Sequence, residues 1–411
     1  MRVSFLSSKS MNFVLYILGI SLFLSCGMAP EVSGQSEESG PKEVKVQPGI
    51  YDFHQLLLLI GDSRVGIVTN HTGSIDGVHI VDSLLNSGIL VKKVFAPEHG
   101  FRGDHADGEN FEDNIDQKTG VPVISLYGNS KKPSRESLED VDLVLFDIQD
   151  VGARFYTYLS TLHYVMQACS EQNIPLIVAD RPNPHTHYVD GPVLKEEFKA
   201  FIGLHPVPIV YGMTIGEYAL MLNGEGWHEA EACDLTVLPC LNYERGMTYE
   251  FPNKPSPNLP TMESVYLYPS ICLFEGTKVS VGRGTSEPFT IIGEPGNKSG
   301  DFVFIPVPKK GASINPKHNG VTCQGYDLSG SISEPSKISQ LDLTWLVRMY
   351  NETDDRSDFF LESGYFDKLA GTDQLRKAII DGIDQDAIKK SWQEDLNTFK
   401  AIRAKYLIYK D

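Results

Sequence analysis

The chain has 411 residues, of which 41% are apolar and 22% are charged, as in an ordinary globular protein of enzyme size. Its formal net charge of −18 argues against a nucleic-acid binder and against electrostatic docking on anionic lipid. A local basic cleft that binds a polyanionic polymer remains compatible with this charge. About 364 residues follow residue 47, which is more than one hydrophobic core usually spans, so two domains are expected.

The N-terminus has the pattern of a secretory signal. A largely apolar run, Met11 to Leu24, follows Arg2 and Lys9, and the small residue Ser25 and then Cys26 come after it in a lipobox-like cleavage site. The run is too short for a comfortable transmembrane helix. We expect residues 1–26 to be a lipoprotein-type signal ending at Cys26, which would carry the lipid. An uncleaved anchor or another cleavage site is the alternative; both readings place the folded part in the cell envelope, in the periplasm or on the outer surface.

Residues 27–47 are mostly polar and predict a flexible tether. Beyond the tether, short runs rich in Val, Ile and Leu alternate with helical patterns. The expected strands lie at 64–69, 90–96, 121–126, 141–146 and 175–179. Near-continuous apolar runs bounded by polar turns are typical of a parallel sheet that is buried on both faces. The pattern therefore predicts a doubly wound α/β domain over residues 48–240.

Helical patterns accompany and follow this sheet. Apolar residues from Tyr158 to Cys169 recur at helical spacing, and Thr214 with Glu217 forms a capping-box pattern that opens another helix. The stretch 252–296 is rich in Pro and Gly. Further helices are expected at 341–350, 372–381 and 386–407. These features predict a smaller α+β domain over residues 241–411.

The common signatures of metal, cofactor and nucleophile sites are missing from the sequence. It contains no CxxC pair, no zinc-type His/Cys spacing, and no GxSxG, GxGxxG, P-loop or HExxH motif. We expect no cofactor and no metal, and we expect the five cysteines beyond Cys26 to be mostly buried thiols. Cys233 and Cys240 could form a disulfide, but they flank an expected strand that would hold them apart. A metal held by His99, His105 and nearby acids stays open as an alternative.

Polar side chains follow most of the expected strands. In an open parallel sheet, ligands bind beyond the carboxyl ends of the strands, and loops at that edge carry function. The candidates are Asn70 after the first strand, Glu98, His99 and Arg102 after the second, Asp147, Gln149, Arg154 and Tyr156 after the fourth, and Asp180, Arg181 and Asn183 after the fifth. A sheet needs no such convergence for its stability, so the pattern indicates a site.

Each of these residues also has a structural interpretation. Glu98 leaves a strand next to His99, where a carboxyl group can donate a proton, but it could be a solvated loop acid. His99 could bond a main-chain carbonyl, and Asp147 and Asp180 could cap the helices that follow. The arginines could be ion-pair partners, and Tyr156 could serve packing.

The second predicted domain has its own dense polar segment. It contains Asn258, Glu275 and Arg283, and glycines flank Arg283 on both sides. Such glycines let the backbone approach a ligand closely while the guanidinium reaches it. A tight structural turn with an ion pair is the alternative. We expect this segment to face the strand ends of the first domain and to close a cleft.

Six motifs carry a resemblance to a known family. They are PEHGFRG at 97–103, FDIQDVGARFYTY at 146–158, DRPNP at 180–184, SPNLPT at 256–261, FEGT at 274–277 and GRGT at 282–285. Over about residues 50–411 the chain resembles the NamZ-type exo-β-N-acetylmuramidases, a family long catalogued as a domain of unknown function. The resemblance implies a Rossmann-like N-terminal domain, a smaller C-terminal domain and a cleft between them. It also implies hydrolysis that releases N-acetylmuramic acid from non-reducing ends of peptidoglycan fragments.

The same resemblance places the family's proposed catalytic glutamate on Glu98. Glycoside hydrolysis needs a proton donor and usually a second carboxylate, for which Asp147 and Asp180 are the candidates. The 2-acetamido group of the sugar could instead act as the nucleophile. Muramic acid also carries a lactyl carboxylate, which a guanidinium would bind. The candidates for that contact are Arg154, Arg181 and Arg283.

Two other functions compete with the glycosidase. A cell-wall lipoprotein could bind muramyl sugars in the same cleft without turnover, with Glu98 as a hydrogen-bond acceptor. A metal-dependent hydrolase could use His99 and nearby acids. In the two sugar-directed readings the partners are peptidoglycan-derived saccharides and, through the lipid, a membrane.

Overall fold

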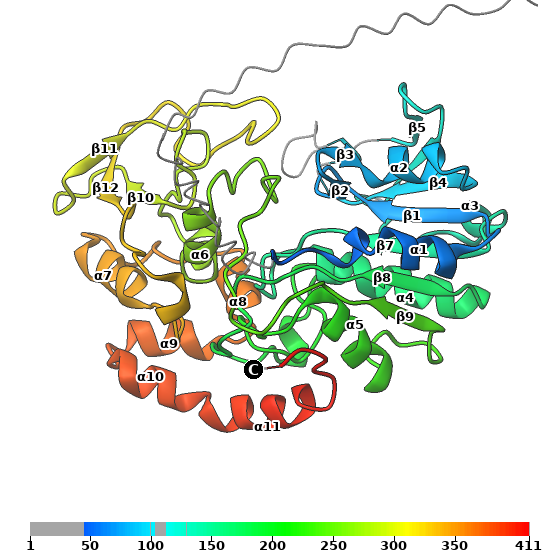
Figure 1. The fold of residues 1–411 in the computed structure, drawn as a ribbon. Helices are drawn as coiled ribbons and strands as arrows, with labels where there is room; N and C mark the ends of the chain where they lie inside the picture. The colour runs from blue at the N-terminus through cyan, green and yellow to red at the C-terminus, as the bar shows by residue number, and fades with distance from the viewer. Residues whose placement is uncertain (1–44, 99, 103–111, 129, 411) are drawn as a thin grey trace, which may run out of the picture. The chain divides into compact units, whose positions relative to one another are not determined.

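A computed structural model describes the protein at residues 45–98, 100–102, 112–128 and 130–410 (Figure 1). The predicted signal with Cys26, most of the predicted tether, and His99 lie outside the described residues. Residues from Lys45 onward form one compact unit. Within the described part of the chain, no helix is both long enough and apolar enough to cross a membrane.

A seven-stranded sheet forms the N-terminal part of this unit. Its strands are β1 (Val65–Thr69), β4 (Val91–Ala96), β5 (Asn114–Ile115), β6 (Pro122–Ser125), β7 (Leu143–Asp147), β8 (Leu176–Ala179) and β9 (Leu235–Leu238). Their order is β5-β6-β4-β1-β7-β8-β9, and every pair is parallel except β5 with β6. Numbered along the chain, the six parallel strands follow the Rossmann order 3-2-1-4-5-6, whose ligand crevice opens where the order reverses. That reversal lies at β1, between β4 and β7.

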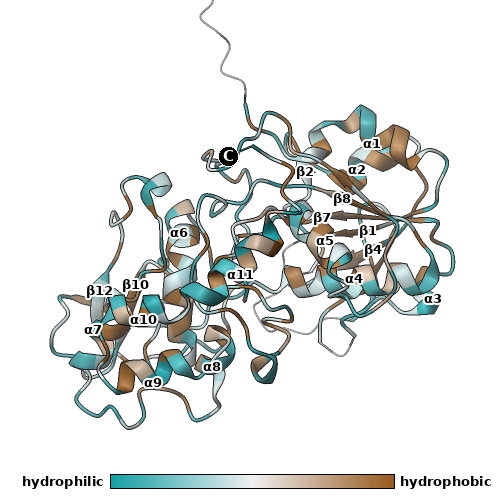
Figure 2. Cartoon of the chain, turned by 90° about the horizontal axis from the view of Figure 1, so that it is seen from below, coloured by the Kyte–Doolittle hydropathy of each residue, from teal (hydrophilic) through white to brown (hydrophobic). Residues whose placement is uncertain are grey.

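The apolar strands are buried on both faces, as their composition predicted. Ile67 of β1 packs in the core that includes α1 (Phe53–Ile60) and α2 (Ile80–Asn86), whereas its neighbour Val68 packs in the core that includes α4 (Tyr158–Gln172). Successive side chains of a strand point to opposite faces, so a continuous apolar run serves both layers. Figure 2 shows these strands as hydrophobic ribbons between more mixed helices. All five expected strands are confirmed.

The expected helices of this region are also confirmed. α4 is buried along most of its length, and it ends at Asn173, which has the left-handed conformation (φ 54°). α5 (Ile215–Gly224) begins with the predicted capping box: the Thr214 hydroxyl accepts from the Glu217 main-chain N–H, and the Glu217 carboxylate accepts from that of Thr214. The shorter elements of this part are η1 (Gly49–Tyr51), β2 (Ser74–Ile75), β3 (Val78–His79), α3 (Arg135–Leu138) and η2 (Glu196–Phe198).

The C-terminal part combines helices with a small antiparallel sheet. The sheet has the order β10 (Ile291–Glu294), β12 (Cys323–Asp327), β11 (Phe302–Phe304). The helices are α6 (Met262–Ile271), η3 (Cys272–Gly276), η4 (Pro335–Lys337), α7 (Thr344–Glu352), α8 (Tyr365–Ala370), α9 (Gln374–Ile380), α10 (Gln385–Ser391) and α11 (Gln393–Arg403). The single helix expected at 386–407 is divided at Trp392, whose indole Nε1 donates to Asp190 Oδ1 at 2.8 Å.

Two features of the interior bear on the predictions. The five cysteines beyond Cys26 are all buried free thiols, so the disulfide considered for Cys233 and Cys240 is absent from the described residues. The core on the α4 side of the sheet continues into residues of α6, α8 and α11. The two parts of the chain therefore share one hydrophobic cluster, and the domain boundary near residue 240 stays a prediction.

Candidate active site

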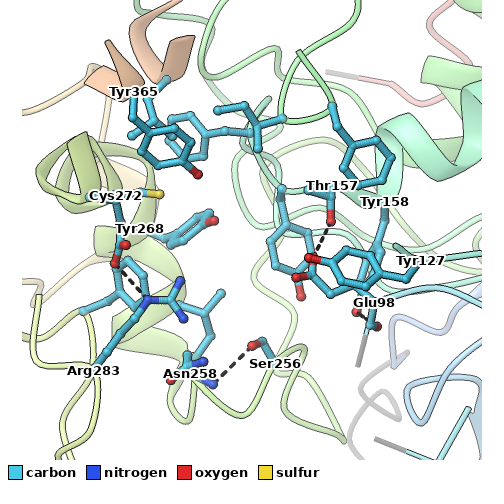
Figure 3. A pocket seen from close by; sticks show the side chains of 18 residues that line it. Glu98, Tyr127, Thr157, Tyr158, Ser256, Asn258, Tyr268, Cys272, Arg283 and Tyr365 are labelled. Carbon is cyan, nitrogen blue, oxygen red and sulfur yellow. Dashed lines mark hydrogen bonds and ion pairs between the residues drawn. The ribbon is translucent and has the colours of Figure 1, made fainter. Parts of the chain in front are cut away.

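A cavity of about 220 Å³ lies at the predicted edge of the large sheet. Its first wall comes from the loops after β4 and β6 and from the start of α4. Its second wall comes from the segment before α6, from α6 and η3, from the loop before β10 and from α8 (Figure 3). Aromatic side chains dominate the lining, as in many small-ligand sites. They include Tyr127, Tyr156, Tyr158, Phe201, Tyr268 and Tyr365.

Glu98 extends into this cavity from the first wall. It is partly buried, and its Oε2 accepts a hydrogen bond from Thr157 Oγ1 at 2.9 Å. Thr157 is the N-cap residue of α4 but makes no side-chain bond to the helix, because its hydroxyl is directed to Glu98. The carboxyl group is therefore held beside the N-terminus of α4. A fixed carboxyl group in a cavity can transfer a proton to a bound ligand.

Asn70 acts on the same wall through Tyr158. The Asn70 Oδ1 accepts from the main-chain N–H of Thr72 at 3.0 Å, which fixes the orientation of the amide because an N–H can only donate. The amide nitrogen Nδ2 therefore faces Tyr158 and donates to its hydroxyl at 2.8 Å. The Tyr158 hydroxyl lies 3.5 Å from the carbonyl oxygen of Glu98. Burial raises the pKa of Tyr158, so the phenol stays protonated. Asn70 does not line the cavity but orients a residue that does.

Arg283 occupies the second wall. Its Nε donates to Glu275 Oε1 at 2.8 Å, and its guanidinium carbon lies 5.0 Å from the centre of the Phe289 ring. Gly282 and Gly284 have φ values of 77° and 84°, and a Cβ at Gly284 would lie 2.6 Å from a main-chain oxygen. Glycine is thus required there, as the sequence suggested. The ion pair of the structural alternative is present, and the arginine also lines the cavity (Figure 3). Its contact with a ligand stays a prediction.

A second cation, which is not itself part of the cavity lining, lies near the Glu275–Arg283 pair. Lys317 lies beside Glu275, and its Nζ donates to the carbonyl oxygens of Phe274, Thr277 and Val279 at 3.1, 2.5 and 3.0 Å. Burial opposes ionisation of Glu275, but the charges of the Arg283 guanidinium and of Lys317 outweigh it and lower the pKa of the carboxyl group. Two cations therefore accompany one carboxylate, in a chain whose net charge is −18.

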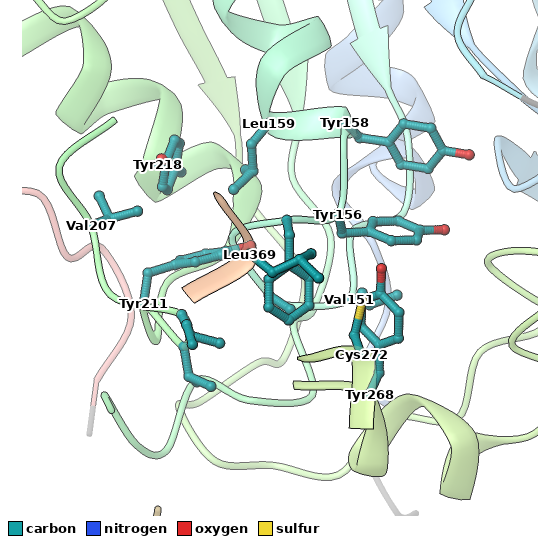
Figure 4. Close-up of a cluster of buried hydrophobic side chains, with 14 of the residues drawn as sticks. Val151, Tyr156, Tyr158, Leu159, Val207, Tyr211, Tyr218, Tyr268, Cys272 and Leu369 are labelled. Atoms are coloured by element: carbon teal, nitrogen blue, oxygen red, sulfur yellow. The ribbon is translucent and has the colours of Figure 1, made fainter. Parts of the chain in front are cut away.

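Two more of the predicted residues, Asn258 and Tyr156, also lie at the cavity. Asn258 lines it, and its Nδ2 donates to the Ala312 carbonyl at 3.0 Å. Tyr156 lines it, and its hydroxyl donates to the Pro255 carbonyl at 2.7 Å. The rings of Tyr156 and Tyr268 belong to the buried cluster beneath the cavity (Figure 4). These side chains join the two parts of the chain.

Two other predicted arginines lie away from the cavity. Arg154 is buried, and its Nη atoms donate to the carbonyls of Pro192, Val207 and Leu369 at 2.7–2.8 Å. Burial lowers its pKa to about 9. Arg181 is buried and donates through Nε to Asp147 Oδ1 at 2.6 Å. Both arrangements follow the structural alternative.

Arg102 is the third predicted arginine that does not line the cavity. It donates to Asp116 Oδ2 at 2.8 Å. Two further candidates bond main-chain carbonyls instead of facing the cavity. Gln149 Nε2 donates to Asp150 and Pro182 at 2.8 Å, and Asn183 Nδ2 donates to the carbonyl oxygen of Met213 at 2.6 Å.

The two aspartates considered as catalytic partners are also buried outside the cavity lining. Asp147 is paired with Arg181, as described above. Asp180 accepts from the Gly216 N–H at 2.7 Å and from the hydroxyls of Thr214 and Tyr409 at 2.7 and 2.6 Å, so it caps the start of α5. Burial raises its pKa to about 6. Among the described lining residues, the carboxylates are Glu98 and Glu275.

His99 and His105, which the metal alternative requires, fall outside the described residues. In the described part of the chain, no group of three or more His, Cys, Asp or Glu side chains is arranged to hold a metal ion.

Residues 65–263 match the profile of "Exo-beta-N-acetylmuramidase NamZ, N-terminal", and residues 266–409 match the profile of its C-terminal part. The chain belongs to the NamZ family. The peptidoglycan beta-N-acetylmuramidase NamZ of Bacillus subtilis (strain 168) is 38% identical over 415 residues, which cover 96% of this chain and 98% of that protein.

Two solved structures share the fold of this NamZ-family chain. Both are DUF1343 family proteins from Bacteroides fragilis NCTC 9343. One is 42% identical with a TM-score of 0.83, and it covers 89% of this chain and 99% of its own. The other is 27% identical with a TM-score of 0.76, and it covers 89% of this chain and 100% of its own. The family resemblance and the predicted α/β fold class are confirmed.

Several side chains in or near the cavity of this NamZ-family chain were not predicted from the sequence. Thr157 and Tyr158 lie in the motif at residues 146–158, but nothing in that motif indicates that they contact Glu98. Tyr268 comes from α6, in a region where a helix was not expected. Lys317 lies in a loop with no recognisable pattern, and only its three carbonyl contacts reveal its place.

Proposed function

We propose that this protein is an exo-acting glycoside hydrolase that releases N-acetylmuramic acid from the non-reducing ends of peptidoglycan fragments. The observation that carries the proposal is the placement of Glu98 and Arg283 in opposite walls of one cavity. The name of the Bacillus subtilis relative supports the same activity. A volume of about 220 Å³ is below the usual range for drug-sized ligands and suits one terminal sugar better than a polymer segment.

Glu98 is the proposed general acid and base. As the acid, its carboxyl group protonates the glycosidic oxygen while the bond from that oxygen to the anomeric carbon breaks. As the base, the resulting carboxylate takes a proton from the water that completes hydrolysis. Thr157 holds Oε2 in place during both steps. The identity of the second catalytic group stays open. Asp147 and Asp180 bond to structural partners instead of lining the cavity. The acetamido group of the sugar could act as the nucleophile in place of a protein carboxylate.

Arg283 is the proposed contact for the lactyl carboxylate. A guanidinium presents a planar fork to a carboxylate, and charge-assisted bonds of this kind are among the strongest in proteins. The positive charges of Arg283 and the nearby Lys317 outnumber the negative charge of Glu275, which fits an anionic sugar. N-acetylglucosamine lacks the lactyl group and would have no comparable contact.

A turnover assay on a chromogenic β-N-acetylmuraminide, with and without a chelator, tests the proposal. We expect release of the chromophore that is unaffected by the chelator. Binding of the sugar without release would favour the non-catalytic wall-binding lipoprotein. Loss of turnover with the chelator, and its recovery with added metal, would favour the metal-dependent hydrolase that uses His99.

We also propose that the mature protein is a lipoprotein of the cell envelope. Residues 1–26 would direct export, Cys26 would carry the lipid, and residues 27–47 would link the lipid to the folded part. The support is the sequence pattern alone: an apolar run behind two cations, followed by a small residue and cysteine.

A further inference from the structure

Lys317 stabilises the segment that carries Glu275 without reaching the cavity itself. An ammonium group has three N–H donors, and three carbonyl oxygens of residues 274–279 accept from Lys317 within 3.1 Å. The residue does not line the cavity. Its donors are therefore engaged by the protein, and any effect on a ligand must act through charge.

The carbonyls could be satisfied by a neutral donor, so the charge of Lys317 requires a separate explanation. Removing an ammonium from water is costly unless an opposite charge is near. Burial and the charge of Arg283 lower the pKa of Lys317, and the charge of Glu275 opposes this shift. Glu275 also accepts from Arg283 Nε at 2.8 Å. Counted over Arg283, Glu275 and Lys317 alone, the net charge is +1 with the lysine and zero without it.

We propose that Lys317 is a specificity-determining residue, which offsets the charge of Glu275 so that the positive charge of Arg283 acts on the carboxylate of the bound sugar. The inference rests on the proposed function. Glu275 orients the guanidinium through Nε, and Lys317 prevents this orienting contact from neutralising the second wall. The three residues thus select an anionic over a neutral N-acetyl sugar.

The test measures dissociation constants by calorimetry for N-acetylmuramic acid and N-acetylglucosamine on the full folded chain. Lys317→Gln keeps amide donors for the carbonyls but removes the charge. We expect roughly tenfold weaker binding of N-acetylmuramic acid. A tenfold change is about 1.4 kcal/mol, which is the interaction of two unit charges about 12 Å apart at an effective dielectric constant of about 20. Binding of N-acetylglucosamine should change less than about twofold. Lys317→Arg should retain most of the preference.

Two further variants control the experiment. Lys309→Met removes another lysine of the same loop, whose Nζ donates to the Thr285 carbonyl at 3.3 Å, and it should leave both dissociation constants unchanged. Glu275→Gln combined with Lys317→Gln returns the net charge to +1. This double variant should recover the preference for N-acetylmuramic acid, which a purely structural role of Lys317 does not predict.

Several outcomes would overturn the inference. An equal loss for both sugars in Lys317→Gln would show that the lysine only anchors its segment, and no loss would show that its charge is irrelevant. If Lys317→Gln does not fold, Lys317→Met is measured with the same expectations, and failure of both to fold assigns a structural role. If the wild-type protein binds neither sugar, the proposed function itself fails. Failure of the role of Lys317 alone would instead leave binding of N-acetylmuramic acid by the wild-type protein intact.

Discussion

Arg283→Lys offers a sharp test of how the cavity recognises an anionic sugar. The substitution keeps the positive charge but removes the planar fork. In the structure, Arg283 uses Nε for Glu275 at 2.8 Å and places its guanidinium 5.0 Å from the Phe289 ring. A single ammonium at the end of a flexible chain cannot hold Glu275 and also present two parallel donors to a ligand.

The size of the expected effect follows from the lost contact. A hydrogen bond to a charged group contributes about 1.5–3 kcal/mol, and part of it returns through the remaining ammonium. We expect N-acetylmuramic acid to bind about 1–3 kcal/mol more weakly, which is roughly 5- to 150-fold in the dissociation constant. Calorimetry with N-acetylmuramic acid and N-acetylglucosamine measures it. A matched loss for the two sugars would refute the reasoning, because N-acetylglucosamine has no lactyl carboxylate.

Three further outcomes are expected. Arg154→Leu leaves three buried carbonyls unpaired and should destabilise the fold by about 3 kcal/mol or more, which a lower Tm would show. Weaker sugar binding at an unchanged Tm would instead indicate that Arg154 contacts the sugar. Thr157→Val removes the donor to Glu98 and should lower kcat about tenfold with little change in KM, whereas an unchanged kcat would show that the bond is dispensable. Cys26→Ala should abolish membrane fractionation of the expressed protein, and unchanged fractionation would contradict the lipid anchor.

Much of the fold could be predicted because the large sheet is buried on both faces. Its strands must be almost entirely apolar, so their positions are visible as Val, Ile and Leu runs, and the order of a doubly wound sheet then fixes which edge binds ligands. Glu98 was predicted for this reason, because it follows one of these strands, whereas Arg283 was predicted from the glycines that flank it. The division of the last helix at Trp392 was missed because it depends on a bond to Asp190, which lies far away in the sequence.

The roles of other polar residues depend on partners that a sequence does not show. Asp147 is the last residue of β7, and Arg181 follows the neighbouring strand β8. That proximity lets them pair with each other at 2.6 Å instead of facing a ligand. Asp180 meets donors from α5 and from Tyr409 near the C-terminus. Their proposed catalytic roles stay predictions, and their geometry supports the structural alternatives. The position of a residue at the end of a strand thus makes it a candidate for the site. Whether it faces a ligand or a structural partner depends on contacts with residues far away in the sequence.

The measurement that tests the central claim most directly is the turnover of Glu98→Gln on a muraminide with a poor leaving group. The substitution preserves shape and removes the transferable proton, so turnover should fall by about 10²- to 10⁴-fold while Tm changes little. A substrate with a good leaving group needs less protonation and should lose less. Near-wild-type turnover of Glu98→Gln on the poor leaving group would contradict the account and place the acid elsewhere.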